Sequence, residues 1–456
     1  MDIINPATES LICSIEVDTP LSIKEKIISA KQALSPWKET DLKERKIMIK
    51  RFQNLLKSHQ NELAIILTQE TGKPISQSHN ELNAVHEQIH FFLEKIDDIL
   101  YYSRTYSLES SLEEQVTYDP LGVIANISSW NFPYFMGVNV FIPALLTGNT
   151  VLYKPSEFST LSGIKIAQLL WASGFPKGVF DTVLGDGKIG ASLIESDINA
   201  VFFTGSYKTG KNIALAAAPR MLKVQLELGG KDAAYICEDV SPQTVASALA
   251  YGAFYNNGQS CCSIDRIYVH QKIAPHFIKE FLTQVKNLPL GAPENNETYI
   301  GPLSGKIQIS HLESQIREAK ALGAQVLCGG RPLDYTGYYF PPTVLSNVNA
   351  QMRIMQEESF GPLVGIQVVE NDDEALEEIN KSSYGLTTSI YCTERQRAKK
   401  ILSRVESRTV YWNCCDRVSP KVSWSASRLS ELGLALGLER IQCFLRARYW
   451  HLNPGL

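Results

Sequence analysis

Residues 122–156 read GVIANISSWNFPYFMGVNVFIPALLTGNTVLYKPS, and this stretch decides the fold class. The runs GVIANIS and TVLYKPS have the short, β-branched character of strands, and VNVFIPALLTG between them is predicted to be a helix that ends at Gly148. Two strands joined by a helix form a βαβ unit, whose strands lie parallel in one sheet. The stretch therefore predicts an α/β protein with a parallel sheet.

The same alternation extends along most of the chain. The helical run TLSGIKIAQLLWASGF precedes VFDTVLG, GASLIES and NAVFFTGS. A second series follows LELGG, with strand runs such as DAAYIC, SIDRIYVH and GPLVGIQVVE and helices near 242–256 and 273–288. Residues 22–106 have helical periodicity, while the texture of 101–120 suggests a β-ribbon or a connecting arm. We therefore expect two α/β units with a boundary near residues 228–231.

The composition is that of an ordinary globular protein. The chain has 456 residues, 44% of them hydrophobic and 20% charged, and a formal net charge of −4, which gives no electrostatic case for nucleic acid or an anionic membrane surface. The start MDIINPATES lacks the pattern of a secretory signal, and no apolar run approaches the roughly 18 residues that span a bilayer. The nine cysteines are scattered, without zinc-site spacing. We expect a cytoplasmic protein with free thiols, no metal site, and neither nucleic acid nor membrane as a partner.

Two adjacent cysteines, Cys261 and Cys262, follow the Gly-Gln turn of FYNNGQSCC. A disulfide between sequence neighbours is strained, because bridged Cα atoms normally lie about 4.4–6.8 Å apart. The pair is therefore inert packing, a redox device, or a nucleophile with a bystander. These residues alone leave the choice open.

Several strand ends carry residues suited to a dinucleotide. GDGKIG, residues 185–190, matches G-x-G-x-x-G, but no acid follows about twenty residues later, so we interpret it as a structural turn before a helix. In FFTGSYKTG, Gly205 and Ser206 stand between a strand and a helix, where backbone N–H groups can bind a pyrophosphate. In KPSE, Lys154 and Glu157 end another strand and suit ribose hydroxyls, although a surface ion pair is the alternative.

Three further motifs offer groups for catalysis. Glu227 in QLELGGKDA stands between leucines, and apolar surroundings favour a general base. Asn131 in WNFP can donate to a developing oxyanion. EESFGP presents Glu358 and Phe360 before a Gly-Pro turn. Each motif by itself is more often structural than catalytic.

Together, WNFP, KPSE, FFTGS, LELGGKDA, FYNNGQSCC and EESFGP resemble the aldehyde dehydrogenase superfamily in order and spacing, from INPATES to about residue 416. The resemblance implies a Rossmann-like cofactor domain (residues 1–100 and 120–229) and a second α/β catalytic domain (230–425). It also implies a small β oligomerisation arm with a C-terminal strand (101–119 and 426–456). The expected assembly is a homodimer or homotetramer.

The resemblance also assigns roles. It makes Cys261, two residues after the Gln, the nucleophile that oxidises an aldehyde to the carboxylic acid, with Cys262 as the bystander. Glu227 would activate the water that hydrolyses the thioester, and Asn131 with the Cys261 N–H would hold the oxyanion. The implied cofactor is NAD, with NADP as the alternative. Trp130 is an expected cofactor contact. Lys154 and Glu157 would bind the adenosine ribose, and Gly205 and Ser206 would lie near the pyrophosphate. Glu358 would hold the nicotinamide ribose, with Phe360 beside the ring.

Alternatives to this reading are a CoA-acylating aldehyde dehydrogenase, a catalytically impaired member with a structural role, and a thiol redox sensor. Phe135, Met136, Asn139 and Trp424 are expected to line a largely apolar substrate tunnel.

The end of the chain departs from the family pattern. Ala426, Glu431 and Arg440 stand where the resemblance leads us to expect small residues or glycine. We expect this to affect the substrate range and the packing of subunits, and not the chemistry at Cys261 directly.

Overall fold

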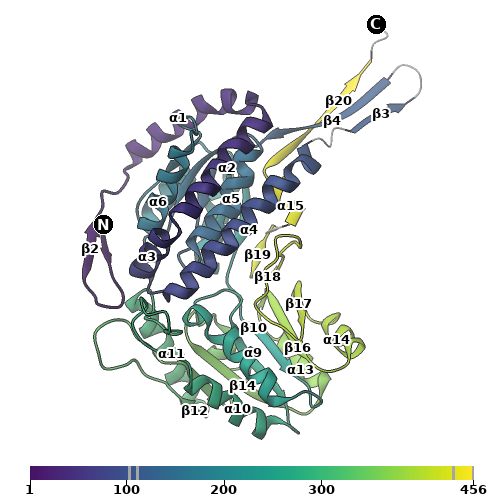
Figure 1. Cartoon of the computed structure of the whole chain (residues 1–456). Helices are drawn as coiled ribbons and strands as arrows, with labels where there is room; N and C mark the ends of the chain where they lie inside the picture. Colours follow the sequence, from purple (N-terminus) through teal and green to yellow (C-terminus); the bar gives the residue numbers. More distant parts are fainter. Residues whose placement is uncertain (101–103, 109–111, 434–436, 454–456) are drawn as a thin grey trace.

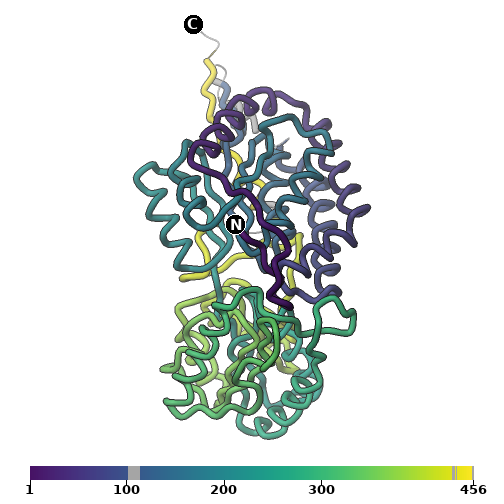
Figure 2. Tube along the Cα trace, turned by 90° about the vertical axis from the view of Figure 1, so that its left-hand side faces the viewer, coloured from purple at the N-terminus to yellow at the C-terminus, as the bar shows by residue number. Residues whose placement is uncertain are grey.

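The structure is a computed structural model that describes the chain except residues 101–103, 109–111, 434–436 and 454–456. Two α/β bodies lie one above the other, and a β-ribbon projects from the upper one (Figure 1). The upper body contains the N-terminal half of the chain together with the C-terminal segment, whereas the lower body is built from the middle of the chain (Figure 2). Within the described residues, no helix is long and apolar enough to cross a membrane.

The first body contains a six-stranded sheet in the order β19-β9-β8-β5-β6-β7. Neighbours from β9 to β7 are parallel, and β19 alone joins antiparallel, at the edge beside β9. The strands are β5 (Val123–Ile127), β6 (Thr150–Lys154), β7 (Phe180–Thr182), β8 (Ala200–Thr204), β9 (Lys223–Glu227) and β19 (Glu431–Leu432). The parallel βαβ arrangement predicted from residues 122–156 is confirmed.

The second body contains a seven-stranded sheet in the order β12-β13-β14-β11-β10-β16-β17. It is parallel except for β12, which pairs antiparallel with β13. The strands are β10 (Asp232–Ile236), β11 (Ile264–His270), β12 (Gln325–Cys328), β13 (Thr343–Ser346), β14 (Leu363–Val369), β16 (Thr387–Tyr391) and β17 (Thr409–Trp412). The expected boundary near 228–231 lies between the two sheets. That the first body holds the cofactor and the second the catalytic thiol stays a prediction.

Helices fill the connections between strands. They are α1 (Pro20–Glu39), α2 (Leu42–Ser58), α3 (Gln60–Thr71), α4 (Ile75–Leu100), α5 (Pro133–Leu146), α6 (Thr160–Ala172), α7 (Gly187–Glu195), α8 (Tyr207–Ala217), α9 (Pro242–Phe254), α10 (Ala274–Lys286), α11 (Lys306–Ala321), α12 (Arg353–Gln356), α13 (Asp372–Asn380), α14 (Arg395–Leu402) and α15 (Gly437–Gln442), with short 3-10 turns η2 (Ala218–Arg220) and η3 (Tyr255–Gly258). Our helical range of 22–106 is wrong at its end, because α4 stops at Leu100 and residues 104–106 belong to a strand.

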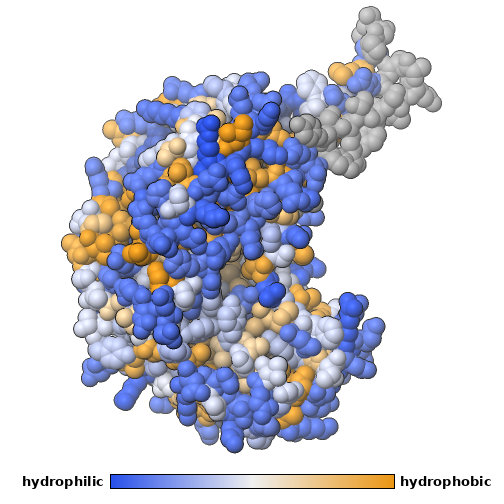
Figure 3. Space-filling view, in the orientation of Figure 1, coloured by the Kyte–Doolittle hydropathy of each residue, from blue (hydrophilic) through white to orange (hydrophobic). Residues whose placement is uncertain are grey.

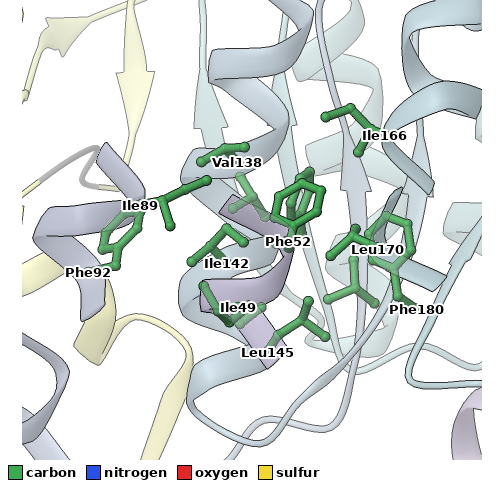
Figure 4. Close-up of a cluster of buried hydrophobic side chains, with 14 of the residues drawn as sticks. Ile49, Phe52, Ile89, Phe92, Val138, Ile142, Leu145, Ile166, Leu170 and Phe180 are labelled. Atoms are coloured by element: carbon green, nitrogen blue, oxygen red, sulfur yellow. The ribbon is translucent and has the colours of Figure 1, made fainter. Parts of the chain in front are cut away.

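Apolar helix faces cover both sides of the first sheet. On one side, α2, α4, α5 and α6 meet in the cluster that Figure 4 shows, with Phe52, Phe92, Ile142 and Leu170 pointing toward one another and Phe180 arriving from β7. On the other side, α1, α7 and α8 pack against the alternate residues of β5, β6 and β8. Because side chains alternate across a strand, each strand contributes to both clusters. The first sheet is therefore doubly wound.

The projecting ribbon is three-stranded, in the order β20-β4-β3. Its strands are β3 (Arg104–Leu108), β4 (Leu112–Pro120) and β20 (Leu445–Leu452), all paired antiparallel. The β-ribbon predicted for 101–120 is confirmed for its described residues; 101–103 and 109–111 lie outside them. Smaller pairings join β1 (Asp2–Ile4) to β2 (Leu11–Ser14), and β15 (Tyr384–Gly385) to β18 (Ser427–Arg428). The segment 426–456 is divided, because β20 enters the ribbon while β19 enters the first sheet.

Candidate active site

Two sheet edges face one another across a cavity of about 1360 Å³. The loops that line it follow the carboxyl ends of β5, β6, β8 and β9, and precede the first residues of β10, β11, β14 and β16. Ligands of open α/β sheets bind at this carboxyl edge. The surface is visibly hollowed between the two bodies (Figure 3). All ten residues predicted for catalysis and cofactor binding line this cavity: Trp130, Asn131, Lys154, Glu157, Gly205, Ser206, Glu227, Cys261, Glu358 and Phe360.

The loop before Cys261 is held by buried amides. Asn256 and Asn257 have left-handed backbone conformations with φ of 52° and 56°, and Gly258 continues the turn at 67°. The Asn256 side-chain amide donates to the carbonyl of Gln259 at 3.2 Å, and the Gln259 Oε1 atom accepts from the backbone N–H of Ser304 at 3.0 Å. These bonds fix where the chain places Cys261, which is partly exposed to the cavity.

Cys262 lies in a different environment from Cys261. It is buried, and its thiol donates to the Asp416 carboxylate with 3.0 Å between Sγ and Oδ1. A hydrogen bond with Cys261 and burial raise the pKa of the Cys262 thiol well above its usual value. All nine cysteines are among the described residues, and all are free thiols. Of the adjacent pair, Cys261 is therefore the one suited to nucleophilic attack.

Asn131 lies at the other side of the Cys261 loop. It is buried, its Nδ2 atom donates to the Gln259 carbonyl at 3.0 Å, and its Oδ1 atom accepts from Ser129 Oγ at 2.8 Å. Glu81 holds the start of the following helix, since its Oε1 atom accepts from the backbone N–H of Tyr134 at 2.9 Å. The bonds to Gln259 and Ser129 orient the Asn131 side-chain amide, with its N–H groups toward the cysteine loop.

Glu227, the last residue of β9, does not have the apolar surroundings that we expected. Leu226 and Leu228 are buried, but alternation along a strand directs them away from the face that Glu227 occupies. The Glu227 Oε1 atom instead accepts from Nη1 of Arg440 at 2.5 Å. The two side chains are 17% and 2% exposed. Of the residues that depart from the family pattern near the C-terminus, Arg440 therefore contacts the expected base; that the departures affect substrate range and packing stays a prediction.

The glycine pair after Glu227 lets three parts of the site come together. A Cβ at Gly229 would lie 2.4 Å from the Glu358 carboxylate, and a Cβ at Gly230 would lie 2.3 Å from the Cys261 carbonyl oxygen. The backbone N–H of Gly230 donates to Glu358 Oε1 at 3.3 Å. Burial, together with the nearby Asp265 carboxylate, raises the pKa of Glu358 to about 8. At neutral pH, Glu358 is thus largely a neutral acid that can both donate and accept hydrogen bonds.

The residues expected to contact adenosine ribose and pyrophosphate lie at or just beyond the carboxyl ends of β6 and β8. Lys154 is buried, burial lowers the pKa of its ammonium group, and Nζ donates to the carbonyl of Pro155 at 3.1 Å. Within the described residues no ion pair joins Lys154 to Glu157, so the surface ion pair is not seen. Gly205 follows β8, and Ser206 caps α8 by accepting from the backbone N–H of Thr209 at 3.4 Å. The free N–H groups of the first turn of α8 therefore lie beside the cavity.

Aromatic rings form another part of the wall. Phe360 has a left-handed φ of 48°, and its ring packs edge-on against Trp130 with centroids 5.2 Å apart. The residues predicted for an apolar tunnel all line the cavity: Phe135, Met136, Asn139 and Trp424. In the GDGKIG run, Asp186 caps α7 by accepting from the backbone N–H of Lys188, while Gly187 and Gly190 line the cavity. That the run is a structural turn stays a prediction.

Comparison with known proteins identifies the family. The family model described as aldehyde dehydrogenase family matches residues 1–449. The chain belongs to the aldehyde dehydrogenase family. It is 32% identical to aldehyde dehydrogenase 1A1 of Oryctolagus cuniculus over 98% of this chain and 91% of the relative, and 33% identical to that of Homo sapiens over 95% and 88%.

Solved aldehyde dehydrogenase structures share this fold over the whole chain. Betaine aldehyde dehydrogenase from Staphylococcus aureus in complex with NAD⁺ has a TM-score of 0.96 and 28% identity, covering 100% of this chain and 92% of its own. PnpE in complex with nicotinamide adenine dinucleotide has a TM-score of 0.97 and 32% identity, with 100% and 94% covered. The family and the α/β fold that the sequence predicted are confirmed.

The sequence motifs do not include two residues that contact the candidate active site, Glu81 and Arg440. Glu81 comes from α4, and Arg440 from α15. Neither lies in a recognisable motif, and Arg440 stood out only as a large residue where a small one was expected. The structure adds both: Glu81 lines the cavity, and Arg440 contacts Glu227, although each comes from an element distant in sequence.

Proposed function

We propose that this protein oxidises an aldehyde to the carboxylic acid, using NAD and a covalent intermediate on Cys261. One observation carries the proposal: a single cavity is lined by an accessible cysteine, an oriented amide, a carboxylate and the strand ends suited to a dinucleotide. Family membership supports the reaction class, and the NAD complexes of two relatives support the cofactor.

The residues present fit NAD. Gly205 leaves room for a close backbone approach, and the N-terminal turn of α8 offers N–H groups and a positive dipole end to phosphate oxygens. Lys154 and Glu157 border the same region with a cation and an acceptor for hydroxyl groups. When bound, NAD would supply the hydride acceptor for the oxidation.

We assign the attack to Cys261 and the stabilisation of charge to its neighbours. The Cys261 thiolate forms a bond to the aldehyde carbon while the carbonyl π bond breaks, and the carbonyl oxygen becomes an oxyanion. The Asn131 amide and the Cys261 backbone N–H donate to that oxyanion, which lowers the barrier. Loss of hydride from the same carbon then leaves a thioester on Cys261.

Hydrolysis of the thioester is assigned to Glu227. Its carboxylate accepts a proton as water attacks the acyl carbon, the carbon–sulfur bond breaks, and the carboxylic acid and the Cys261 thiolate separate. Both side chains line the cavity, so one bound acyl group can lie between them. A water-activating base favours hydrolysis over transfer to CoA.

The projecting ribbon supports a proposal on assembly. Tyr449 and Trp450 on β20 are 70% and 39% exposed, and the ribbon that carries them projects away from the body (Figure 1). We propose a cytoplasmic homodimer or homotetramer in which the ribbon contacts another copy. Light scattering after size exclusion gives the mass; a monomer at micromolar concentration would contradict the assembly.

The function is tested with aliphatic, aromatic and carboxylated aldehydes. The purified protein is mixed with each aldehyde and NAD, the absorbance of reduced cofactor is followed, and the acid is identified by mass spectrometry. Turnover that requires added CoA and yields an acyl thioester would favour the acylating alternative. No reduction of NAD with any aldehyde would favour the structural member.

A further inference from the structure

The C-terminal segment reaches the expected base through backbone pairing. β19 runs antiparallel to the end of β9, with Glu431 opposite Glu227 and Leu432 opposite Leu226. The backbone N–H of Leu228 also donates to the Ser430 carbonyl at 2.8 Å. This pairing fixes β19 beside Glu227.

Arg440 on α15 then approaches the same carboxylate. Its side chain is 2% exposed, its guanidinium lies 5.8 Å from the centre of the Phe202 ring, and Phe202 stacks on Phe444 at 4.4 Å. Aromatic contacts and burial leave such a side chain little rotamer freedom. Arg440 is therefore presented to Glu227 in a fixed position.

The geometry separates the guanidinium from the reaction space. Glu227 lines the cavity, whereas Arg440 is not among the described residues that line it. The guanidinium therefore binds Oε1 without itself lining the cavity in which an acyl group and water would meet. A carboxylate has acceptor capacity on both oxygens, so this bond leaves the group able to receive a proton.

We infer that Arg440 is a positioning residue for hydrolysis: its ion pair keeps the Glu227 carboxylate oriented toward the acyl group on Cys261. The inference rests on the proposed role of Glu227 in deacylation. It concerns only that step, because the attack of Cys261 and the loss of hydride involve no proton transfer to Glu227 in the proposed scheme. Arg440 should therefore affect the release of acid and leave the first half of the reaction unchanged.

The test compares Arg440→Gln and Arg440→Lys with the wild type by rapid mixing of protein, NAD and aldehyde. Arg440→Gln should release about one reduced cofactor per site in a fast phase and then turn over about tenfold to a hundredfold more slowly, as expected for the loss of a charge-assisted bond. Mass spectrometry should find the acyl group on Cys261. Arg440→Lys keeps the charge but loses the planar guanidinium, so it should turn over faster than Arg440→Gln and remain below the wild type.

Lys223→Gln is the matched control. Lys223, the first residue of β9, donates from Nζ to the carbonyl of Cys443 at 2.5 Å, so it also ties the C-terminal segment to β9 but at the end far from Glu227. Its replacement should leave both phases unchanged. If Lys223→Gln loses turnover as Arg440→Gln does, the contact serves only docking and the inference is wrong.

Other outcomes also overturn the inference. Normal turnover in Arg440→Gln would show that the ion pair does not assist Glu227. Faster turnover would show that the ion pair keeps Glu227 from acting in hydrolysis. A fast phase reduced in proportion to turnover would indicate a structural role, as would an Arg440→Lys variant as slow as Arg440→Gln. If Arg440→Gln does not fold, the lysine variant decides alone. The Glu227→Gln variant distinguishes the proposed function from this inference. Normal turnover in Glu227→Gln refutes the proposed function. Slow turnover in Glu227→Gln together with normal turnover in Arg440→Gln refutes only the inference.

Discussion

Gly230 lies against Cys261 so closely that a Cβ at position 230 would stand 2.3 Å from the Cys261 carbonyl oxygen. The bend after β9 and the loop before β11 thus touch through backbone atoms. The expected base, Glu227, comes three residues before Gly230 and lines the same cavity as Cys261. The first prediction follows directly from the contact between Gly230 and Cys261.

Gly230→Ala should displace the cysteine loop, because the added Cβ is attached directly to the backbone and would clash with the backbone carbonyl oxygen of Cys261. We expect about 1–3 kcal/mol of lost stability, as for overpacked sites, and at least tenfold lower kcat/KM. Thermal unfolding and steady-state kinetics measure the two effects. An alanine variant with wild-type kinetics would mean that the loop position is not critical.

Cys261→Ala and Cys262→Ala form a matched pair. The first removes the partly exposed thiol and should abolish aldehyde oxidation, while the second removes a buried thiol that contacts Asp416 and should keep most of the activity. Reduction of NAD is the measurement. Activity that survives in Cys261→Ala would remove it as the nucleophile.

Glu227→Gln should slow deacylation by about 10²–10⁴-fold, the usual contribution of a general base. The attack and the loss of hydride should persist, so the acyl group should accumulate on Cys261. Quenched samples analysed by mass spectrometry show the adduct. Its absence, combined with normal release of acid, would exclude Glu227 as the base.

NAD should be preferred over NADP by about tenfold to a hundredfold in kcat/KM. The 2′-phosphate of NADP would face the Glu157 carboxylate, which repels it, while the buried Lys154 offsets part of this repulsion. Glu157→Gln should narrow the ratio. A clear preference for NADP in the wild type would contradict the proposed ribose contact.

Stability should fall as the pH rises from 7 to 9, in part because of Glu358. Its pKa is raised to about 8 in the folded protein against an ordinary value of 4.5, so the folded state binds the extra proton between these values. The contribution of Glu358 to the free energy of unfolding is therefore fully present below about pH 4.5 and is lost as the pH rises through 8. Linkage for one such group gives a loss of about 1.4 kcal/mol between pH 7 and 9.

The matched variant for this effect is Glu358→Gln, which cannot ionise. Its melting temperature should decline less than that of the wild type over the same pH range. Parallel declines in both proteins would assign the alkaline instability to other groups.

The sequence by itself determined the family, the alternation of strands and helices, and the ten residues that meet in the cavity. It could do so because short β-branched runs define the strands of a parallel sheet, and the carboxyl ends of parallel strands share one edge. Residues such as Lys154, Gly205 and Glu227 directly end or follow those strands. The local sequence was therefore enough to predict that these residues lie at the same edge of the sheet.

Only the tertiary structure decided which groups surround the expected base. Leucines on both sides of Glu227 suggested apolar surroundings, yet adjacent side chains of a strand point to opposite faces, so they say little about the carboxylate itself. Its partner, Arg440, is 213 residues away in sequence and arrives because β19 pairs with β9. A contact at that separation depends on the path of the whole backbone, which no local pattern encodes.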